Sequence, residues 1–202
     1  PECISFEKQE LFYPEKCIGC GKCAEGCFSG ARVPCGKDMT AEEIVREIER
    51  DLPYYGKDGG VTFSGGEPLA QAPILSECID LCRERNIACA VETSLIYYDE
   101  SIFRKLSVVM ADFKIWDPVL HRQYVGADNA VILENFKKLS LLPVRVIART
   151  PVIPEISQGI PEISAFLKTL PNVIRYELLP YHPLGRDKAR ALGKEMPLFT
   201  VP

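Results

Sequence analysis

Four closely spaced cysteines are the part of this sequence in which metal chemistry is easiest to recognise. They lie in the segment CIGCGKCAEGC, and they are Cys17, Cys20, Cys23 and Cys27. The spacing C-x2-C-x2-C-x3-C is that of a bacterial ferredoxin motif, in which neighbouring thiolates reach the corners of one iron–sulfur cluster. Glycines between the cysteines let the backbone wrap close to such a cluster. The spacing therefore predicts that these thiolates bind a [4Fe–4S] cluster.

A structural zinc site is the alternative for this segment. Zinc modules usually present two cysteine pairs with a longer spacer, so the compact spacing favours iron–sulfur. The fourth ligand stays open, because the last cysteine of a ferredoxin set can serve a second cluster, and only one set is present here. Cys27, Cys35 and Cys3 compete for this role, and Phe28 stands where the ferredoxin pattern has proline. The motif favours Cys27, with Cys35 as the second choice.

Three further cysteines are expected to be core thiols. Cys78 and Cys82 are four residues apart in a helical pattern, and Cys89 lies in a strand-like stretch. Free cysteine is among the most frequently buried residue types. The odd total of nine cysteines, together with the dense cluster, favours a reducing cytoplasmic location over a disulfide framework.

The composition excludes some classes of function. The chain has 202 residues and a net charge of -4, so it lacks the basic excess typical of nucleic-acid binding. No apolar run approaches the roughly 18 residues of a membrane helix. The chain begins with Pro1-Glu2 and carries no signal peptide, which suggests a fragment of a longer soluble protein.

Regular elements are expected to begin at Thr40, after a segment rich in Cys, Gly and Pro. Thr40 and Glu43 form a capping-box pattern, which predicts the start of a helix. Strand-like and helical stretches then alternate. Strands are expected at 61–65, 87–92, 108–114, 144–150 and 173–180, and helices near 70–85, 99–106, 129–141 and 160–169. We therefore predict two domains, 1–38 and 39–202.

Five short apolar strands that alternate with helices predict a parallel sheet buried on both faces, either doubly wound or part of a barrel. Each strand is followed by polar or glycine residues. These ends are Gly65-Gly66-Glu67, Glu92-Thr93-Ser94, Asp112-Phe113-Lys114, Arg149-Thr150 and Tyr181-His182. Ligands of β/α folds bind where the carboxyl ends of the strands converge. These strand-end residues therefore predict one site built from the whole sheet.

Four motifs, taken in order, resemble one known family. They are CIGCGKCAEGC, SGGEPLAQ, ADFKIWD and ELLPYHPLG. Together they resemble the radical S-adenosylmethionine activating enzymes of glycyl radical enzymes, among which the pyruvate formate-lyase activating enzyme is the best known. The resemblance covers nearly the whole chain.

The resemblance implies an α/β fold: a partial parallel (β/α)6 barrel, here without its first strand, preceded by a small ferredoxin-like [4Fe–4S] insert at residues 1–38. It also implies a second, catalytic [4Fe–4S] cluster, at which S-adenosylmethionine yields a 5′-deoxyadenosyl radical that takes a hydrogen atom from a glycine of the partner. The implied partners are a glycyl radical enzyme and a flavodoxin-like or ferredoxin-like electron donor.

The family's catalytic C-x3-C-x2-C loop is absent from this sequence. In relatives that loop often continues into Asn-Pro-Glu, and this chain begins with Pro1-Glu2. We therefore expect the catalytic cysteines and the first strand to lie immediately upstream. On this basis the chain alone would be inactive, and its own cysteine cluster would be the accessory one.

The resemblance also implies contacts to S-adenosylmethionine. Gly65 and Gly66 would let the backbone approach the methionyl amino group, and Glu67 would add an acceptor. A simple turn between strand and helix, with Pro68 at the helix start, is compatible with the same residues. His182 would contact the nucleoside part of the cofactor.

Charged residues complete the expected site. Lys114 would neutralise the carboxylate of the cofactor, and Asp112 lies on the same side of its strand by the period of two. Glu92 and Asp112 stand where relatives bind a monovalent cation, although a salt bridge at a strand end is an alternative role. Arg149 is either a second carboxylate partner or a surface arginine. His121 is expected at the surface.

The sequence departs from the family pattern in several places. Many relatives that carry the insert have two four-cysteine sets, whereas this chain has one. Leu95 replaces a glycine that is common after Thr-Ser, and Glu155 follows Pro154 where relatives commonly have glycine. The chain also ends soon after Leu192-Gly193. The Leu95 and Glu155 replacements weaken inferences about the partner-binding face.

We therefore expect a truncated activating enzyme, with two alternatives. The first is another radical enzyme with the same partial barrel, such as a small-molecule synthase, which would need a substrate pocket. The second is a non-catalytic iron–sulfur electron carrier, which would have no affinity for S-adenosylmethionine at Gly65–Glu67.

Overall fold

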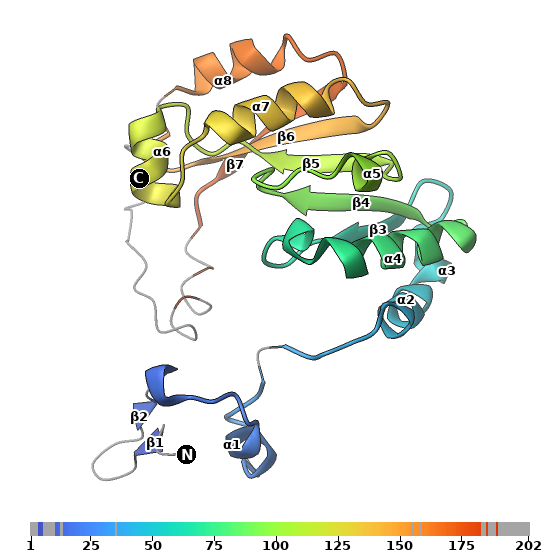
Figure 1. The fold of residues 1–202 in the computed structure, drawn as a ribbon, viewed down its shortest axis with the longest axis vertical. Coiled ribbons are helices and arrows are strands. Elements are labelled where there is room, and N and C mark those ends of the chain that lie inside the picture. Colours follow the sequence, from blue (N-terminus) through green and yellow to red (C-terminus); the bar gives the residue numbers. More distant parts are fainter. Residues whose placement is uncertain are drawn as a thin grey trace. The chain divides into compact units, whose positions relative to one another are not determined.

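The computed structural model describes residues 4–5, 11–12, 14–34, 36–154, 156–157 and 159–182, with Gly185 and Ala189. The sequence predictions at Cys3, Cys35, Glu155 and 192–193 lie outside these residues. The described residues form two compact units (Figure 1). The first contains those before Met39 and those from His182 onward, and the second contains Met39–Tyr181.

The first unit consists mainly of turns. Its elements are β1 (Ile4–Ser5), β2 (Leu11–Phe12), the 3-10 helix η1 (Pro14–Lys16) and α1 (Lys22–Glu25). The two short strands pair antiparallel, with Ile4 opposite Phe12. Gly19 and Gly21 adopt φ angles of 67° and 73°, a left-handed conformation that glycine enters without a steric penalty. These turns shape the loop that carries the clustered cysteines.

The second unit begins with the predicted capping box. The Thr40 hydroxyl accepts a hydrogen bond from the Glu43 N–H at 3.3 Å, and the Glu43 carboxylate accepts one from the Thr40 N–H at 2.8 Å. Helix α2 (Ala41–Glu49) starts there, and α3 (Leu52–Tyr55) follows. The capping-box prediction is confirmed.

Five parallel strands form the centre of the second unit, in the order β3-β4-β5-β6-β7. Their bounds are Gly60–Phe63, Ala88–Thr93, Val108–Asp112, Arg145–Val152 and Val173–Pro180. Each coincides with a predicted strand to within a few residues. The sequential order of parallel strands is consistent with the predicted partial barrel (Figure 1).

Helices connect successive strands. They are η2 (Pro68–Gln71), α4 (Ala72–Glu84), α5 (Glu100–Phe103), α6 (Pro118–Val125), α7 (Ala130–Leu139) and α8 (Ile160–Leu167). Four lie where the sequence pattern predicts a helix, whereas η2 and α6 are additional. None of the helices in the described segments combines the length and the apolarity that crossing a bilayer requires.

The helices cover only one face of the sheet. Alternate strand residues such as Val91, Val109 and Val146 are fully buried in one core cluster with side chains of α4, α5, α7 and α8. Their neighbours Met110 and Ile147 point to the other face and are only half-buried. The prediction of a sheet buried on both faces is therefore wrong for the described residues. Right-handed crossovers place every connecting helix on the same side when the strand order never reverses.

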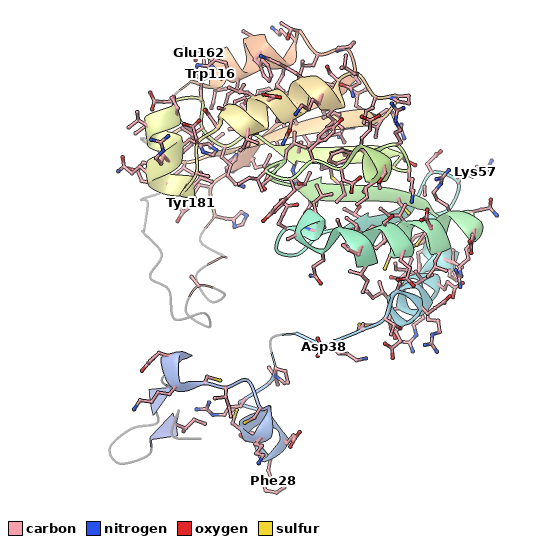
Figure 2. The ribbon with its side chains drawn as sticks, viewed as in Figure 1. Phe28, Asp38, Lys57, Trp116, Glu162 and Tyr181 are labelled. Carbon is pink, nitrogen blue, oxygen red and sulfur yellow. The ribbon has the colours of Figure 1, made fainter. Side chains whose placement is uncertain are left out.

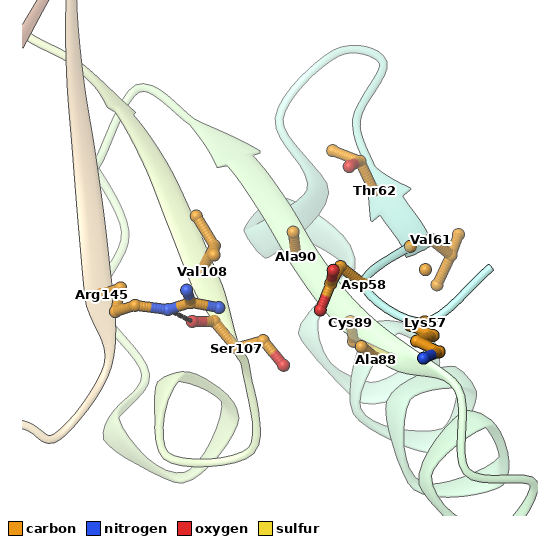
Figure 3. A pocket seen from close by; sticks show the side chains of 12 residues that line it. Lys57, Asp58, Val61, Thr62, Ala88, Cys89, Ala90, Ser107, Val108 and Arg145 are labelled. Atoms are coloured by element: carbon orange, nitrogen blue, oxygen red, sulfur yellow. Dashed lines mark hydrogen bonds between the residues drawn. The ribbon is translucent and has the colours of Figure 1, made fainter. Parts of the chain in front are cut away.

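A hollow of about 500 Å³ lies at the amino-terminal ends of the strands (Figure 3). Lys57, Asp58 and Arg145 are among the residues that line it, and Arg145 donates a hydrogen bond from Nε to the Ser107 carbonyl at 3.4 Å. This hollow is at the opposite edge of the sheet from the predicted ligand contacts, so it is a different place from the site considered next.

Candidate functional site at the carboxyl ends of the strands

Glu67 fixes the glycine turn after β3 to the end of β4. One carboxylate oxygen accepts hydrogen bonds from the Thr93 hydroxyl at 2.8 Å and the Leu69 N–H at 3.3 Å. The other accepts from the N–H of Ser94 at 2.8 Å and from its hydroxyl. Both carboxylate oxygens of Glu67 thus accept hydrogen bonds from the protein itself. Glu67 therefore holds the preceding turn, Gly65–Gly66, in position against the end of β4.

The turn itself is open. Gly65 has a φ of 125°, a conformation that side chains rarely allow. A Cβ built on either Gly65 or Gly66 would meet no atom within 4 Å. The protein's own packing therefore does not require glycine at position 66, whereas close approach of a ligand to this backbone would explain it.

Arg149 brings two carboxylates together. Its Nη1 donates to Glu92, and its Nη2 and Nε donate to one oxygen of Asp112 at 3.1 and 3.2 Å. Burial opposes the charged form of Arg149, but the hydrogen bond that Arg149 donates to Glu92 and the charges of Asp112 and Glu92 outweigh it and raise the arginine pKa. The Arg149 side chain is only 15% exposed, so this is an ion-pair network inside the site and not a surface arginine.

The strand register explains this network. Asp112 of β5 is the direct partner of Arg149 of β6, and Arg149 is in turn the partner of Glu177 of β7. Sequence reasoning missed Glu177, because the alternation in VIRYELLP does not give the register that places it opposite Arg149. Glu177 also accepts a hydrogen bond from Arg175 at 3.0 Å.

A guanidinium group lies between the two carboxylates, and binding of a monovalent cation there stays a prediction. Arg149 stands between the two carboxylates for which the family resemblance implies that ion. In the part of the chain that the structure describes, no three Cys, His, Asp or Glu side chains are grouped as ligands of a metal ion. The positive charge between Glu92 and Asp112 therefore comes from Arg149.

Lys114 lies just beyond the end of β5 on the same side as Asp112. Its Nζ is 3.3 Å from the second oxygen of Asp112, and its side chain is 35% exposed. An ammonium group has three hydrogen-bond donors, and Asp112 takes one. The remaining donors can meet an acidic group of a ligand at this edge of the sheet.

The clustered cysteines belong to the first unit. Cys17, Cys20 and Cys23 are exposed, and the Cys27 thiol is 3.4 Å from the Ser29 hydroxyl, which lowers the pKa of that thiol. Four accessible thiols on a glycine-rich loop are donors of the kind that iron–sulfur clusters use. Their sulfurs are not gathered around one point among the described residues, so cluster binding stays a prediction.

The cysteines of the second unit are core thiols, as predicted. Cys78, Cys82 and Cys89 are each no more than 2% exposed. Burial raises the pKa of the Cys78 thiol to about 11, which keeps it protonated at neutral pH.

The two histidines are placed differently from each other. His121 of α6 is fully buried, so the prediction of a surface histidine is wrong. Its Nδ1 is 2.6 Å from the Ala127 carbonyl, and this hydrogen bond turns the ring toward the loop that follows α6. His182 is exposed and belongs to the first unit, and its contact with a nucleoside stays a prediction.

Comparison with models of known protein families shows which family the chain belongs to. Residues 15–167 match the model of the radical SAM superfamily. The chain belongs to this superfamily. The family's cofactors are a [4Fe–4S] cluster and S-adenosylmethionine. The open glycine turn and the spare donors of Lys114 suit the amino and carboxylate groups of S-adenosylmethionine.

Named relatives of this radical SAM chain are activating enzymes. It is 36% identical over 195 residues to the isethionate sulfite-lyase activating enzyme of Desulfovibrio desulfuricans, covering 92% of this chain and 62% of the relative. It is 38% identical over 181 residues to the 4-hydroxyphenylacetate decarboxylase activating enzyme of Clostridioides difficile, covering 86% and 57%. The chain thus spans less than two thirds of the length of these relatives.

Solved structures agree with the radical SAM fold. A domain of the pyruvate-formate lyase-activating enzyme from Bacteroides vulgatus is 30% identical, with a TM-score of 0.56 over 62% of this chain and 82% of that chain. SuiB of Streptococcus suis bound to S-adenosylmethionine has a TM-score of 0.60 at 18% identity, over 77% of this chain and 37% of that chain. The SuiB likeness concerns the fold alone.

Proposed function

We propose that the protein containing this chain activates a glycyl radical enzyme by removing a hydrogen atom from one of its glycines. The observation that carries the proposal is the carboxyl edge of the sheet, where an open glycine turn and Lys114 offer complementary contacts to an amino acid group. The names of the relatives supply the class of protein substrate. The [4Fe–4S] cluster and S-adenosylmethionine, when bound, supply the radical chemistry.

The residues of this chain bind and orient the cofactor in this proposal. The backbone of Gly65 and Gly66 meets the methionyl amino group, and Glu67 holds that turn in place. Lys114 neutralises the carboxylate, and Asp112 orients Lys114.

Arg149 and His182 have supporting roles. Arg149 keeps Glu92 and Asp112 in register and balances their charge, because its donors are directed at these carboxylates. His182 contacts the nucleoside.

The first unit has an electron-transfer role in this proposal. Residues 1–38 form a ferredoxin-like insert whose cluster is accessory to the catalytic one. Its ligands are Cys17, Cys20, Cys23 and Cys27. The insert takes electrons from a flavodoxin-like or ferredoxin-like protein, and residues 39–202 form the partial barrel.

The test uses the full-length protein, loaded with iron–sulfur clusters under anaerobic conditions. It is mixed with S-adenosylmethionine, a reductant and purified isethionate sulfite-lyase or 4-hydroxyphenylacetate decarboxylase. We expect 5′-deoxyadenosine by chromatography and a glycyl radical signal by electron paramagnetic resonance. Lys114→Met should lower both, while Lys168→Met, at an exposed lysine that ends α8, should change neither.

The other outcomes separate the alternatives. Formation of 5′-deoxyadenosine without a radical on either partner would favour a radical enzyme that acts on a small molecule. Reversible cluster reduction without binding of S-adenosylmethionine would favour an electron carrier.

A further inference from the structure

Lys114 stands in a segment that has no secondary structure of its own. Strand β5 ends at Asp112, and the chain from Phe113 to Trp116 leaves the sheet before α6 begins. Backbone carbonyls in such a segment need other hydrogen-bond partners when they are buried. The position of the Lys114 side chain depends on how these carbonyls are held.

Asn129 holds the segment on the carboxyl side of Lys114. Its side chain is buried, with 3% exposure, and its Nδ2 donates to the carbonyls of Ile115 at 3.1 Å and Trp116 at 2.6 Å. Both hydrogens of that amide nitrogen are thereby used. Asn129 immediately precedes α7, so the hydrogen bonds connect the segment to the start of a core helix.

Two further side chains, those of Thr150 and Tyr176, hold the segment on the amino side of Lys114. The hydroxyl of Thr150 in β6 is fully buried and donates to the Phe113 carbonyl at 2.6 Å. The hydroxyl of Tyr176 in β7 donates to Thr150 at 3.0 Å. The Phe113 N–H also donates to the Arg149 carbonyl at 2.8 Å. The carbonyls before and after Lys114 are therefore both fixed by buried polar side chains.

Packing fixes the end of the same segment. A Cβ at Gly159 would be 2.7 Å from the Trp116 Cβ, so only glycine allows this approach. The Trp116 ring lies 6.2 Å from the ring of Phe166 in α8, next to Glu162 of that helix in Figure 2. Trp116 is therefore packed closely against the start of α8.

We infer that Asn129, together with the Thr150–Tyr176 pair, is a positioning residue that sets where the Lys114 ammonium group meets the carboxylate of the bound ligand. The inference rests on the proposed role of Lys114. A flexible lysine binds well only when its backbone is held within about 0.5 Å of the productive position by surrounding hydrogen bonds. Asn129 itself does not touch the ligand in this proposal, because its amide hydrogens are directed at the backbone.

The test is a double-mutant cycle on the affinity of the full-length, cluster-loaded protein for S-adenosylmethionine, measured by equilibrium dialysis. Asn129→Ala should raise the dissociation constant about 10-fold, and Lys114→Met should raise it by at least as much. In the Lys114→Met background, Asn129→Ala should add less than about 2-fold, because the group it positions is gone.

Asn172→Ala is the matched control. Asn172 likewise donates from Nδ2 to backbone carbonyls, those of Leu139 and Val144 at 2.9 Å each and that of Leu142 at 3.5 Å, but at the amino-terminal end of β6 and β7. It should leave the affinity within about 2-fold of the unsubstituted protein. An equal loss of affinity in Asn172→Ala, or an undiminished effect of Asn129→Ala in the Lys114→Met background, would overturn the inference.

Thr150→Val keeps the test decisive if Asn129→Ala does not fold. It removes the donor to the Phe113 carbonyl with little change of volume and should weaken binding in the same Lys114-dependent way. A loss of affinity from Thr150→Val that persists without Lys114 would contradict the inference. If Lys114→Met alone leaves the affinity unchanged, it is the proposed ligand contact of Lys114 that fails.

Discussion

At the scale of single residues, Arg149 organises the charges of the carboxyl edge. Glu92 and Asp112 come from neighbouring strands, and their negative charges would repel each other without a cation between them. The guanidinium group is planar and carries several donors, so it can pair with both carboxylates at once. A lysine at this position would supply the positive charge but not the planar set of donors that reaches both carboxylates.

Arg149→Gln should therefore lower the free energy of unfolding by about 2 kcal/mol, because it leaves two half-buried carboxylates without their shared cation. Arg122→Gln is the control, since Arg122 pairs with Asp128 at 2.7 Å on the surface and should cost no more than about 1 kcal/mol. Urea denaturation measures both. Equal effects of the two substitutions would show that the Arg149 network has no special stability.

Leu95 has a backbone conformation that favours glycine, the residue that the family resemblance implies there. Its φ is 59°, a left-handed conformation that costs a residue with a Cβ about 1 kcal/mol. The Leu95 side chain is fully buried, and the Leu95 carbonyl accepts a hydrogen bond from Asn135 at 3.0 Å. Burial of the leucine compensates for the backbone strain.

Leu95→Gly should consequently destabilise the protein by about 1–3 kcal/mol, because the lost core packing exceeds the relieved strain. The control is Asn86→Gly at an exposed position with the same φ of 59°, where only strain is relieved. That variant should be neutral or slightly more stable in thermal unfolding. If Leu95→Gly raised the melting temperature as well, the leucine would not contribute to the core.

At the scale of elements, the sequence predicts the five parallel strands and the helices α2, α4, α5, α7 and α8, because each has an apolar periodicity. Helix α6 was missed since PVLHRQYV has no clear apolar face, and the same ambiguity led to the wrong placement of His121. The burial of only one sheet face was also not predicted. An apolar strand pattern indicates that a strand is buried, but it does not indicate which face of the sheet the connecting helices cover.

Short helices in this fold depend on their caps, as α5 illustrates. Asp99 accepts hydrogen bonds from the N–H groups of Ser101 and Ile102 at 2.9 and 3.2 Å and from the Ser101 hydroxyl at 2.6 Å. The Ser101 hydroxyl and these backbone N–H groups lower the Asp99 pKa against the opposing effect of burial. Asp99→Ala should cost about 1 kcal/mol near neutral pH.

The pH dependence of this substitution follows from the sign of the shift. A carboxylate with a lowered pKa in the folded state adds stability above its unfolded pKa of 3.8, and that stability is lost as the pH falls further. The difference in unfolding free energy between the original protein and Asp99→Ala should shrink below about pH 4. Urea denaturation across this range measures it, with Asp58→Ala in an exposed turn as control. A constant difference would contradict the capping role.

At the scale of the whole molecule, the two units differ in how exposed their cysteine side chains are. The thiols at 17, 20 and 23 are exposed, whereas those at 78, 82 and 89 are buried. Sequence spacing predicts this contrast, because the first set is close together in a glycine-rich loop and the second follows apolar periodicity. Sequence spacing does not predict how the sulfurs of the first set are arranged in the metal-free protein, because a bound cluster would itself draw the thiolates together.

Alkylation of the metal-free protein should follow this contrast. Iodoacetamide near pH 8 should modify Cys17, Cys20 and Cys23 within minutes, while Cys78, with a pKa raised to about 11 by burial, should react only after denaturant is added. Peptide mass spectrometry distinguishes the sites. Rapid labelling of Cys78 in the folded protein would show that the core of α4 opens readily.

The candidate site was predictable in its residues but not in their mutual contacts. Strand ends and family motifs indicate Gly65, Glu67, Asp112 and Lys114. They do not indicate that both carboxylate oxygens of Glu67 accept hydrogen bonds from Leu69, Thr93 and Ser94, or that Arg149 lies between two carboxylates, because these contacts depend on register and side-chain conformation.

The central claim is that the carboxyl edge of the sheet binds S-adenosylmethionine, and Gly66→Val in the full-length, cluster-loaded protein tests it most directly. A Cβ at Gly66 would meet no atom within 4 Å, so the variant should still fold. Equilibrium dialysis should show at least a 10-fold loss of affinity, about 1.4 kcal/mol, with no loss for Gly36→Val, another glycine with open space. Unchanged affinity of a folded Gly66→Val protein would contradict the assignment of this site.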